Sequence, residues 1–254
     1  MTKNELLSFI AFKNEQEKKE AEFYMAVKGV ELHCRILDYL GCDFEKSKIE
    51  WPKIANVLRT DKALRDIIYK YLATLEEYIR AFISNKYIDS VQQKFWIDGT
   101  SQRQEDKIKT NIASGKNLFD VLEDTNFGSL IQQVKNLPDG DKKLLFGDAY
   151  SDNNLGAVKE LRNAVSHHKF LARYELKFCS INGVEGCSLI DNIKNLRQLL
   201  PERYRYGKNG KGGITAELNK IGINLDRNDM YHTKRGTKHE NSRQKIKRNS
   251  GCYK

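Results

Sequence analysis

Hydrophobic residues recur at intervals of three and four through most of this chain, which is the spacing that one face of an α-helix requires. The spacing predicts one helix over 16–40, a short helix over 51–58 with Pro52 in its first turn, and a long helix over 61–87. Shorter helices are predicted further along, over 106–113, 116–123, 127–136, 141–149, 152–167, 188–200 and 214–221. The pattern favours an all-α fold.

The helical pattern is interrupted late in the chain. Residues 170–181 alternate weakly between apolar and polar and lead into Asn182-Gly183, a dipeptide typical of hairpin turns, so we expect a small β-hairpin there. Residues 204–213 are rich in Gly and Lys and predict a flexible link. From Arg227 onward the chain is polar, basic and aperiodic, which predicts a poorly ordered tail. The expected organisation is a helical domain over 1–200 and a basic extension over 201–254.

Charge is distributed unevenly between these two parts. The net charge is +10, and residues 201–254 hold 14 Lys and Arg against 5 Asp and Glu. A basic arm of this kind is typical of proteins that contact phosphate, although many such tails are simply solvated. The extension also contains Tyr204 and Tyr206, which can stack on bases. We expect RNA contacts from Arg203, Arg205, Lys208, Lys211, Lys234 and Arg235.

Several function classes are disfavoured by what the sequence lacks. No apolar run is long enough to cross a membrane, and residues 1–14 carry no secretory signal. The five cysteines are widely spread and form no C-x-x-C pair, which argues against a disulfide framework or a zinc site. We therefore expect a cytoplasmic protein that needs no membrane, metal or cofactor.

One segment gathers residues suited to phosphate chemistry. It reads Leu-Arg-Asn-Ala-Val-Ser-His-His over 161–168, late in the helix predicted over 152–167. On a helical wheel Asn163 and His167 share a face, and the long side chain of Arg162 can swing toward it. A histidine titrates near neutral pH and can move a proton, while a guanidinium binds phosphate oxygens and stabilises developing negative charge. These groups suit attack of a ribose 2′-hydroxyl on the adjacent phosphate.

The same segment resembles a known signature. "LRNAVSHHKFL" over 161–171 is similar to the Arg-Asn-x-x-x-His-His motif of the Abi-like abortive-infection proteins, which belong to the HEPN superfamily of helical proteins. "LATLEEYIRAFISNKY" over 72–87 resembles the upstream helix of that family, in which a Glu and an Arg stand four residues apart. The resemblance covers roughly residues 15–200.

The resemblance implies a HEPN-type helical bundle that dimerises and cleaves single-stranded RNA without a metal, as an abortive-infection or toxin–antitoxin toxin restrained by an RNA or protein antitoxin. Carried over to this chain, Arg162 would bind the scissile phosphate, Asn163 would orient it and His167 would act as acid or base. His168, Arg80 and Glu76 would support the site. Lys169 stands where some family members carry a tyrosine that is modified to silence them.

Other interpretations remain open at this point. Arg162 could pair with a nearby acid and His167 could simply end a helix, which would make the chain a non-catalytic HEPN-like RNA-binding module or a helical interaction protein. A metal-dependent nuclease built on Asp139 and Glu175 is a further alternative. The spacing alone is weak evidence, because a second Arg-Asn-x-x-x-His runs from Arg227 to His232 in the basic tail.

Overall fold

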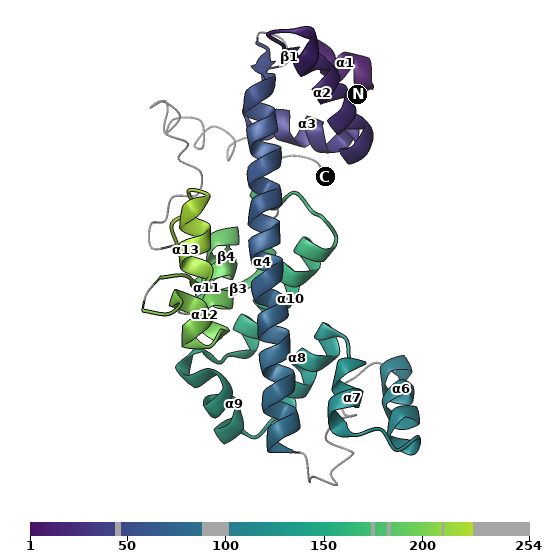
Figure 1. The fold of residues 1–254 in the computed structure, drawn as a ribbon, viewed down its shortest axis with the longest axis vertical. Coiled ribbons are helices and arrows are strands. Elements are labelled where there is room, and N and C mark those ends of the chain that lie inside the picture. The colour runs from purple at the N-terminus through teal and green to yellow at the C-terminus, as the bar shows by residue number, and fades with distance from the viewer. Residues whose placement is uncertain (44–46, 88–101, 174–175, 182–183, 210, 226–254) are drawn as a thin grey trace, which may run out of the picture.

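The computed structural model describes residues 1–43, 47–87, 102–173, 176–181, 184–209 and 211–225. Its central element is α4 (Trp51–Lys86), a single helix of 36 residues along which the other elements are arranged (Figure 1). The helix buries one side chain every three or four residues: Leu64, Ile68, Leu72, Leu75, Ile79 and Ile83. This apolar stripe makes α4 the common wall of the hydrophobic core.

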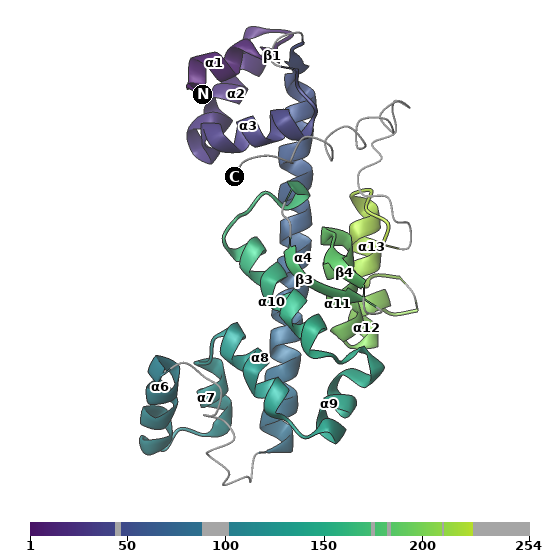
Figure 2. The ribbon, with the colours of Figure 1, turned by 180° about the vertical axis from the view of Figure 1, so that it is seen from behind.

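The first elements pack around the start of α4 (Figures 1 and 2). They are α1 (Lys3–Ser8), β1 (Ile10–Ala11), α2 (Glu15–Lys28), α3 (Val30–Tyr39) and β2 (Ile49–Glu50). The two short strands pair in parallel, with Ile10 opposite Ile49, and β2 leads directly into α4. The core of this N-terminal unit contains Leu6, Ile10, Ala21, Met25, Ile36, Leu37, Trp51, Ile54, Ala55 and Phe170.

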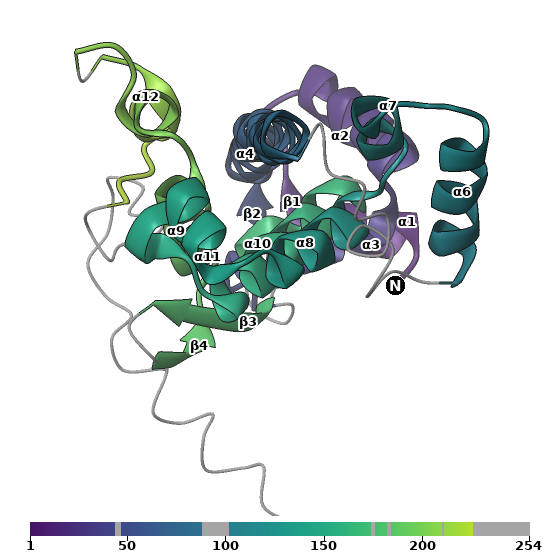
Figure 3. The same cartoon turned by 90° about the horizontal axis from the view of Figure 1, so that it is seen from below.

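The remaining helices follow α4 in the chain, and most of them form a second, larger core on its surface. They are α6 (Gln102–Ala113), α7 (Leu118–Glu123), α8 (Phe127–Asn136), α9 (Asp139–Phe146), the 3₁₀ turn η1 (Gly147–Ala149), α10 (Asp152–Ser166), the 3₁₀ turn η2 (Leu171–Arg173) and α11 (Leu189–Leu199). Between α10 and α11 the antiparallel strands β3 (Leu176–Ile181) and β4 (Val184–Cys187) form a hairpin. Helix α10 lies between α4 and this hairpin (Figure 3).

The largest differences from the predicted helices lie in the first third of the chain. The helix predicted over 16–40 is broken at Gly29, whose φ of +86° lies in the left-handed region that favours glycine and ends α2. The helices predicted over 51–58 and 61–87 are one element, because residues 53–86 contain no Gly or Pro that would end a helix. Asp61, which we expected at a helix start, is buried within α4.

Helix α1 and the strands β1 and β2 were not predicted, whereas the hairpin was. Helix α1 begins with a capping box, in which Thr2 and Glu5 each accept a hydrogen bond from the other's backbone N–H, and this T-x-x-E pattern is visible in the sequence. The strands β1 and β2 have two residues each, too few for an alternating pattern to be recognised. The hairpin prediction is confirmed by β3 and β4, while its Asn182-Gly183 turn lies outside the described residues.

The start of the basic extension belongs to the bundle. It contains α12 (Glu202–Tyr206) and α13 (Gly213–Lys220), and Ile214, Leu218, Ile223 and Leu225 are buried in the main core. Glu217 of α13 accepts hydrogen bonds from Lys70 at 2.6 Å and from the Tyr71 hydroxyl at 3.0 Å on α4. The hydrophobic core thus continues past the boundary that the sequence predicts at residue 200.

The segment predicted as a flexible link is closely packed instead. A Cβ atom on Gly207 would lie 2.5 Å from the carbonyl oxygen of Lys211, and one on Gly213 would lie 2.7 Å from the carbonyl oxygen of Arg205. These glycines are therefore required by close backbone approach. The poorly ordered tail predicted from Arg227 lies outside the described residues.

The all-α fold class is confirmed, since the described part of the chain adds to its helices only two two-stranded sheets and an isolated bridge between Lys208 and Lys211. No helix among the described residues is both long enough and apolar enough to cross a membrane.

Candidate functional site

Helix α10 presents the Arg-Asn-x-x-x-His-His segment. Ser151 caps its start by accepting a hydrogen bond from the backbone N–H of Asn154. The apolar stripe Leu155, Val158, Leu161 and Val165 is fully buried against the core, as the sequence predicts. Because this stripe fixes the rotation of α10, it also fixes where the polar residues between its members point.

The two histidines lie where α10 ends. His167 is the C-cap, and its backbone N–H donates to the carbonyl of Asn163 at 3.0 Å. His168 has a φ of +52°, its N–H donates to Val165, and the next N–H, of Lys169, donates to Ala164 at 3.0 Å. This is the Schellman arrangement, in which the left-handed position is usually a glycine. Both histidine side chains are exposed.

The signature residues occupy different sides of the helix end. Arg162 and Asn163 are half-buried on α10 and His167 is exposed. Asn163 and His167 stand one turn apart, whereas Arg162 and His167 are separated by roughly 140° around the helix axis. Within the described part of the chain, no side-chain hydrogen bond or ion pair involves Arg162, Asn163 or His167. The helix geometry therefore puts Asn163 and His167 on one side of α10 and Arg162 on another.

The expected supporting pair of Glu76 and Arg80 is formed on α4. Arg80 donates to the Glu76 carboxylate at 2.6 Å and to the carbonyls of Leu122 and Thr125 at 2.9 Å each, with both charged side chains largely buried. These bonds fasten the connection between α7 and α8 to α4. No contact recorded between described residues joins this pair to the signature on α10, so its part in the site stays a prediction.

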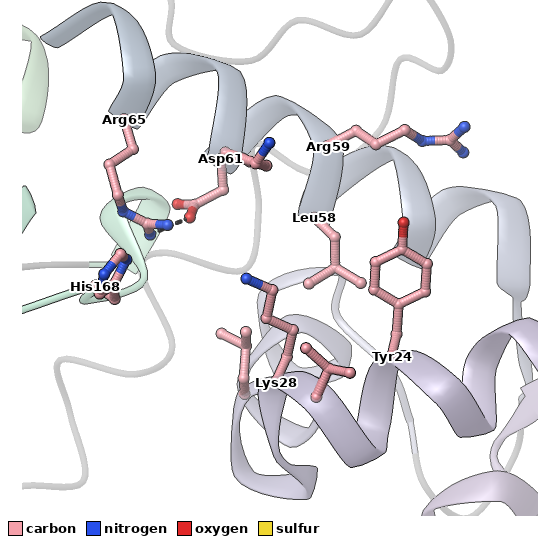
Figure 4. Close-up of a pocket in the computed structure, with 10 residues that line it drawn as sticks. Tyr24, Lys28, Leu58, Arg59, Asp61, Arg65 and His168 are labelled. Atoms are coloured by element: carbon pink, nitrogen blue, oxygen red, sulfur yellow. Dashed lines mark hydrogen bonds and ion pairs between the residues drawn. The ribbon is translucent and has the colours of Figure 1, made fainter. Parts of the chain in front are cut away.

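A cavity of about 360 Å³ lies beside His168, between α2, α3 and α4 (Figure 4). Four cationic side chains and one carboxylate contribute to its wall. In full, its lining is Tyr24, Val27, Lys28, Leu32, Leu58, Arg59, Asp61, Lys62, Arg65 and His168. The helix end that carries the signature therefore opens onto a basic hollow.

Asp61 connects α4 to the chain just after the signature. Its carboxylate accepts from Arg65 at 2.5 Å and from the backbone N–H of Leu171 at 2.8 Å, and Arg65 also donates to the carbonyl of Lys169 at 2.9 Å. Burial raises the pKa of Asp61, while the guanidinium of Arg65 and the hydrogen bonds oppose that shift. These bonds hold residues 169–171 against α4 and so position the end of α10.

The basic residues of the extension serve different purposes. Arg205 is half-buried and donates to the carbonyl of Leu200, which ties α12 to the end of α11. Arg203, Lys208 and Lys211 are exposed, and the first two line a second cavity of about 470 Å³ together with Tyr206. Lys234 and Arg235 lie outside the described residues.

The cavity residues were missed by sequence reasoning, although a signal exists. Arg59, Lys62 and Arg65 stand three residues apart, so each is a neighbour of the next along α4, while Arg59 and Arg65 are separated by roughly 120° around its axis. Lys28 lies at the end of α2 because the helix breaks at Gly29, and the sequence-based prediction missed that break. The regular spacing of basic residues over 59–65 therefore predicts the part of the cavity wall that α4 contributes.

Comparisons of this chain with protein-family models, with curated proteins and with solved structures found no match. Among the residues that the structure describes, no three His, Cys, Asp or Glu side chains gather closely enough to hold a metal ion.

Proposed function

We propose that this protein is a metal-independent endoribonuclease of the HEPN type that cleaves single-stranded RNA with Arg162, Asn163 and His167. One observation supports this most directly: α10 ends in an exposed imidazole, with an amide one turn before it, and neither side chain has a recorded partner among the described residues. If His167 served only to end the helix, the side-chain amide of Asn163 one turn before it would add nothing to that role.

The proposed reaction divides the work among three groups. His167 takes the proton of a ribose 2′-hydroxyl, whose oxygen attacks the adjacent phosphorus. The bond from phosphorus to the 5′-oxygen of the next nucleotide then breaks, and that oxygen takes a proton from water. The guanidinium of Arg162 stabilises the negative charge that develops on the phosphate oxygens. The products are a 2′,3′-cyclic phosphate and a 5′-hydroxyl. Asn163 orients either the phosphate or the imidazole.

The proposed enzyme is a homodimer, because one chain does not direct Arg162 and His167 at the same point. With roughly 140° between them around the helix axis, the two groups meet on one phosphate most simply when Arg162 faces His167 of the partner subunit across a twofold axis. Exposure of His167 at the end of α10 is consistent with such a shared cleft.

The proposed biological setting is defence against phage, with the nuclease acting as an abortive-infection or toxin–antitoxin toxin held in check by an RNA or protein antitoxin. Exposed Arg203, Lys208 and Lys211 would add salt-dependent RNA affinity that does not depend on sequence. Cleavage of cellular RNA by an unrestrained copy would stop growth.

The test is incubation of the purified protein with labelled single-stranded RNA, with and without EDTA. The wild type is expected to cleave equally in both, and His167→Ala is expected to lose cleavage while keeping its circular dichroism spectrum. His232→Ala is the matched control, because it removes the histidine of the other Arg-Asn-x-x-x-His sequence. Equal cleavage by His167→Ala would refute the catalytic role, and RNA that is bound yet intact would favour a binding module.

A further inference from the structure

The cavity beside His168 has a strongly cationic side. Lys28 on α2 and Arg59, Lys62 and Arg65 on α4 line it, against the single carboxylate of Asp61. The close-up shows the ammonium group of Lys28 pointing toward the space below Asp61 and beside His168 (Figure 4). An excess of positive charge around a hollow of this kind favours an anionic occupant.

The cations are not neutralised by their neighbours. The only carboxylate in the wall is already paired with Arg65, at 2.5 Å. Lys62 lies 3.8 Å from Asp66, and that pair is largely exposed and thus weak. For Lys28 and Arg59 no ion pair with a described residue is recorded. The hollow therefore offers two cationic groups, from two different helices, that are available to a ligand.

Arg65 adds a donor that is buried and fixed in direction. Its guanidinium is held by Asp61 and by the carbonyl of Lys169, and its Nε is buried with no hydrogen-bond partner among the described residues. Because these two acceptors fix its orientation, the guanidinium of Arg65 holds its positive charge at this end of the cavity. The imidazole of His168 lines the same end of the cavity.

The opposite side of the cavity is apolar. Val27, Leu32 and Leu58 contribute to it, and the ring of Tyr24 stands beside Leu58 with its hydroxyl toward Arg59 (Figure 4). A simple inorganic anion would leave this surface unused, whereas a planar base can pack on it. The volume of about 360 Å³ is within the range of sites that hold a small organic ligand.

We infer that this cavity binds a nucleotide by its phosphate monoester, with the phosphate between Lys28 and Arg65 and the base against Tyr24 and Leu58 (Figure 4). The nucleotide is either the 5′-phosphorylated end of an RNA strand or a free mononucleotide, since both present the same chemistry. The inference goes beyond the cleavage proposed above, because binding here requires neither Arg162 nor His167 to act.

The test measures binding of the full-length protein by isothermal titration calorimetry. The ligands are a 2′-O-methyl trinucleotide with a 5′-phosphate, the same trinucleotide with a 5′-hydroxyl, and adenosine monophosphate. The 2′-O-methyl groups remove the attacking hydroxyl, so the result is independent of any cleavage. The 5′-phosphate is expected to strengthen binding at least about tenfold, as a charged hydrogen bond does.

The variant is Lys28→Gln, at an exposed position that is expected to fold normally, with Lys19→Gln on the same helix α2 as the matched control. Lys28→Gln is expected to weaken binding of the phosphorylated ligand about tenfold, and the control is expected to leave it unchanged. If only the trinucleotide binds, the site holds a strand end, and if adenosine monophosphate binds as well, a free nucleotide suffices. Equal binding of the phosphate and hydroxyl forms, or of Lys28→Gln and wild type, would overturn the inference.

Discussion

Removal of the Asp61 carboxylate should destabilise the protein far more than removal of an exposed acid on the same helix. Asp61→Ala deletes the acceptor for Arg65 and for the backbone N–H of Leu171. It leaves a guanidinium with only about 13% of its side chain exposed and no counter-ion. Breaking one member of a buried ion pair costs about 3–5 kcal/mol.

The expected change is large enough to measure by thermal unfolding. For a chain of this size each kcal/mol moves the melting temperature by about 2–4 °C, so a loss near 3 kcal/mol predicts a decrease of roughly 6–12 °C. Circular dichroism at 222 nm follows the transition. Asp61→Asn, which keeps an acceptor oxygen for Leu171, is expected to lose about half as much as Asp61→Ala.

Two further variants separate the ion pair from general damage to α4. Asp66→Ala, which breaks an exposed pair with Lys62 at 3.8 Å, should change stability by less than about 1 kcal/mol. The double substitution Asp61→Leu with Arg65→Met replaces the pair by apolar side chains and should recover much of the loss, because it leaves no unpaired buried charge. The reasoning is refuted if Asp61→Ala lowers the melting temperature no more than Asp66→Ala does.

Three other variants test separate parts of the fold. Burial lowers the pKa of His33, so below about pH 6.5 the unfolded chain binds a proton that the folded chain does not, and the free energy of unfolding should fall. In urea titrations, His33→Gln should lose less stability than wild type between pH 7.5 and pH 5. His168→Gly should raise stability by about 0.5–1 kcal/mol in the same titrations, since φ of +52° is strained for any residue with a Cβ. Arg80→Met should cost about 2–4 kcal/mol in thermal unfolding, because Glu76 and two carbonyl groups lose a charged donor.

Each of these variants has a control. His167→Gln, at an exposed histidine, should lose as much stability between pH 7.5 and pH 5 as wild type does. If His33→Gln also loses as much as wild type, another group is responsible for the pH dependence. His168→Val should be less stable than wild type, and a stabilised valine variant would contradict the strain argument. Arg35→Met, which breaks the exposed pair with Glu31, should be nearly neutral beside Arg80→Met.

The helices of the second core could be predicted closely because their periodicity and caps agree. For α8, predicted over 127–136, the structure gives the same bounds, and Asn126 caps it by accepting from Ser129. The break at Gly29 and the continuity through Asp61 were missed for opposite reasons. The break at Gly29 depends on a positive φ, which a glycine permits but does not require. The continuity through Asp61 depends on burial of a carboxylate, a group that is usually found at helix starts.

The candidate site could be predicted only in part. The stripe Leu155, Val158, Leu161 and Val165 correctly fixed which face of α10 is buried, so Asn163 and His167 were expected on one face. The cavity beside His168 could not be predicted, because it depends on residues 28 and 59–65 meeting the end of α10 in space. Such meetings arise from tertiary contacts with no trace in local periodicity.

Because α4 is one continuous helix, its length sets how the two hydrophobic cores are placed relative to each other. At 1.5 Å per residue the helix extends roughly 54 Å, and it enters both the cluster around Trp51 and the cluster around Leu75. Adding or deleting one residue between them would swing one cluster about the helix axis by roughly 100° relative to the other. Loops of this protein can therefore change length without rotating one core against the other. Insertions or deletions in α4 between the cores preserve their orientation only when they add up to nearly whole helical turns.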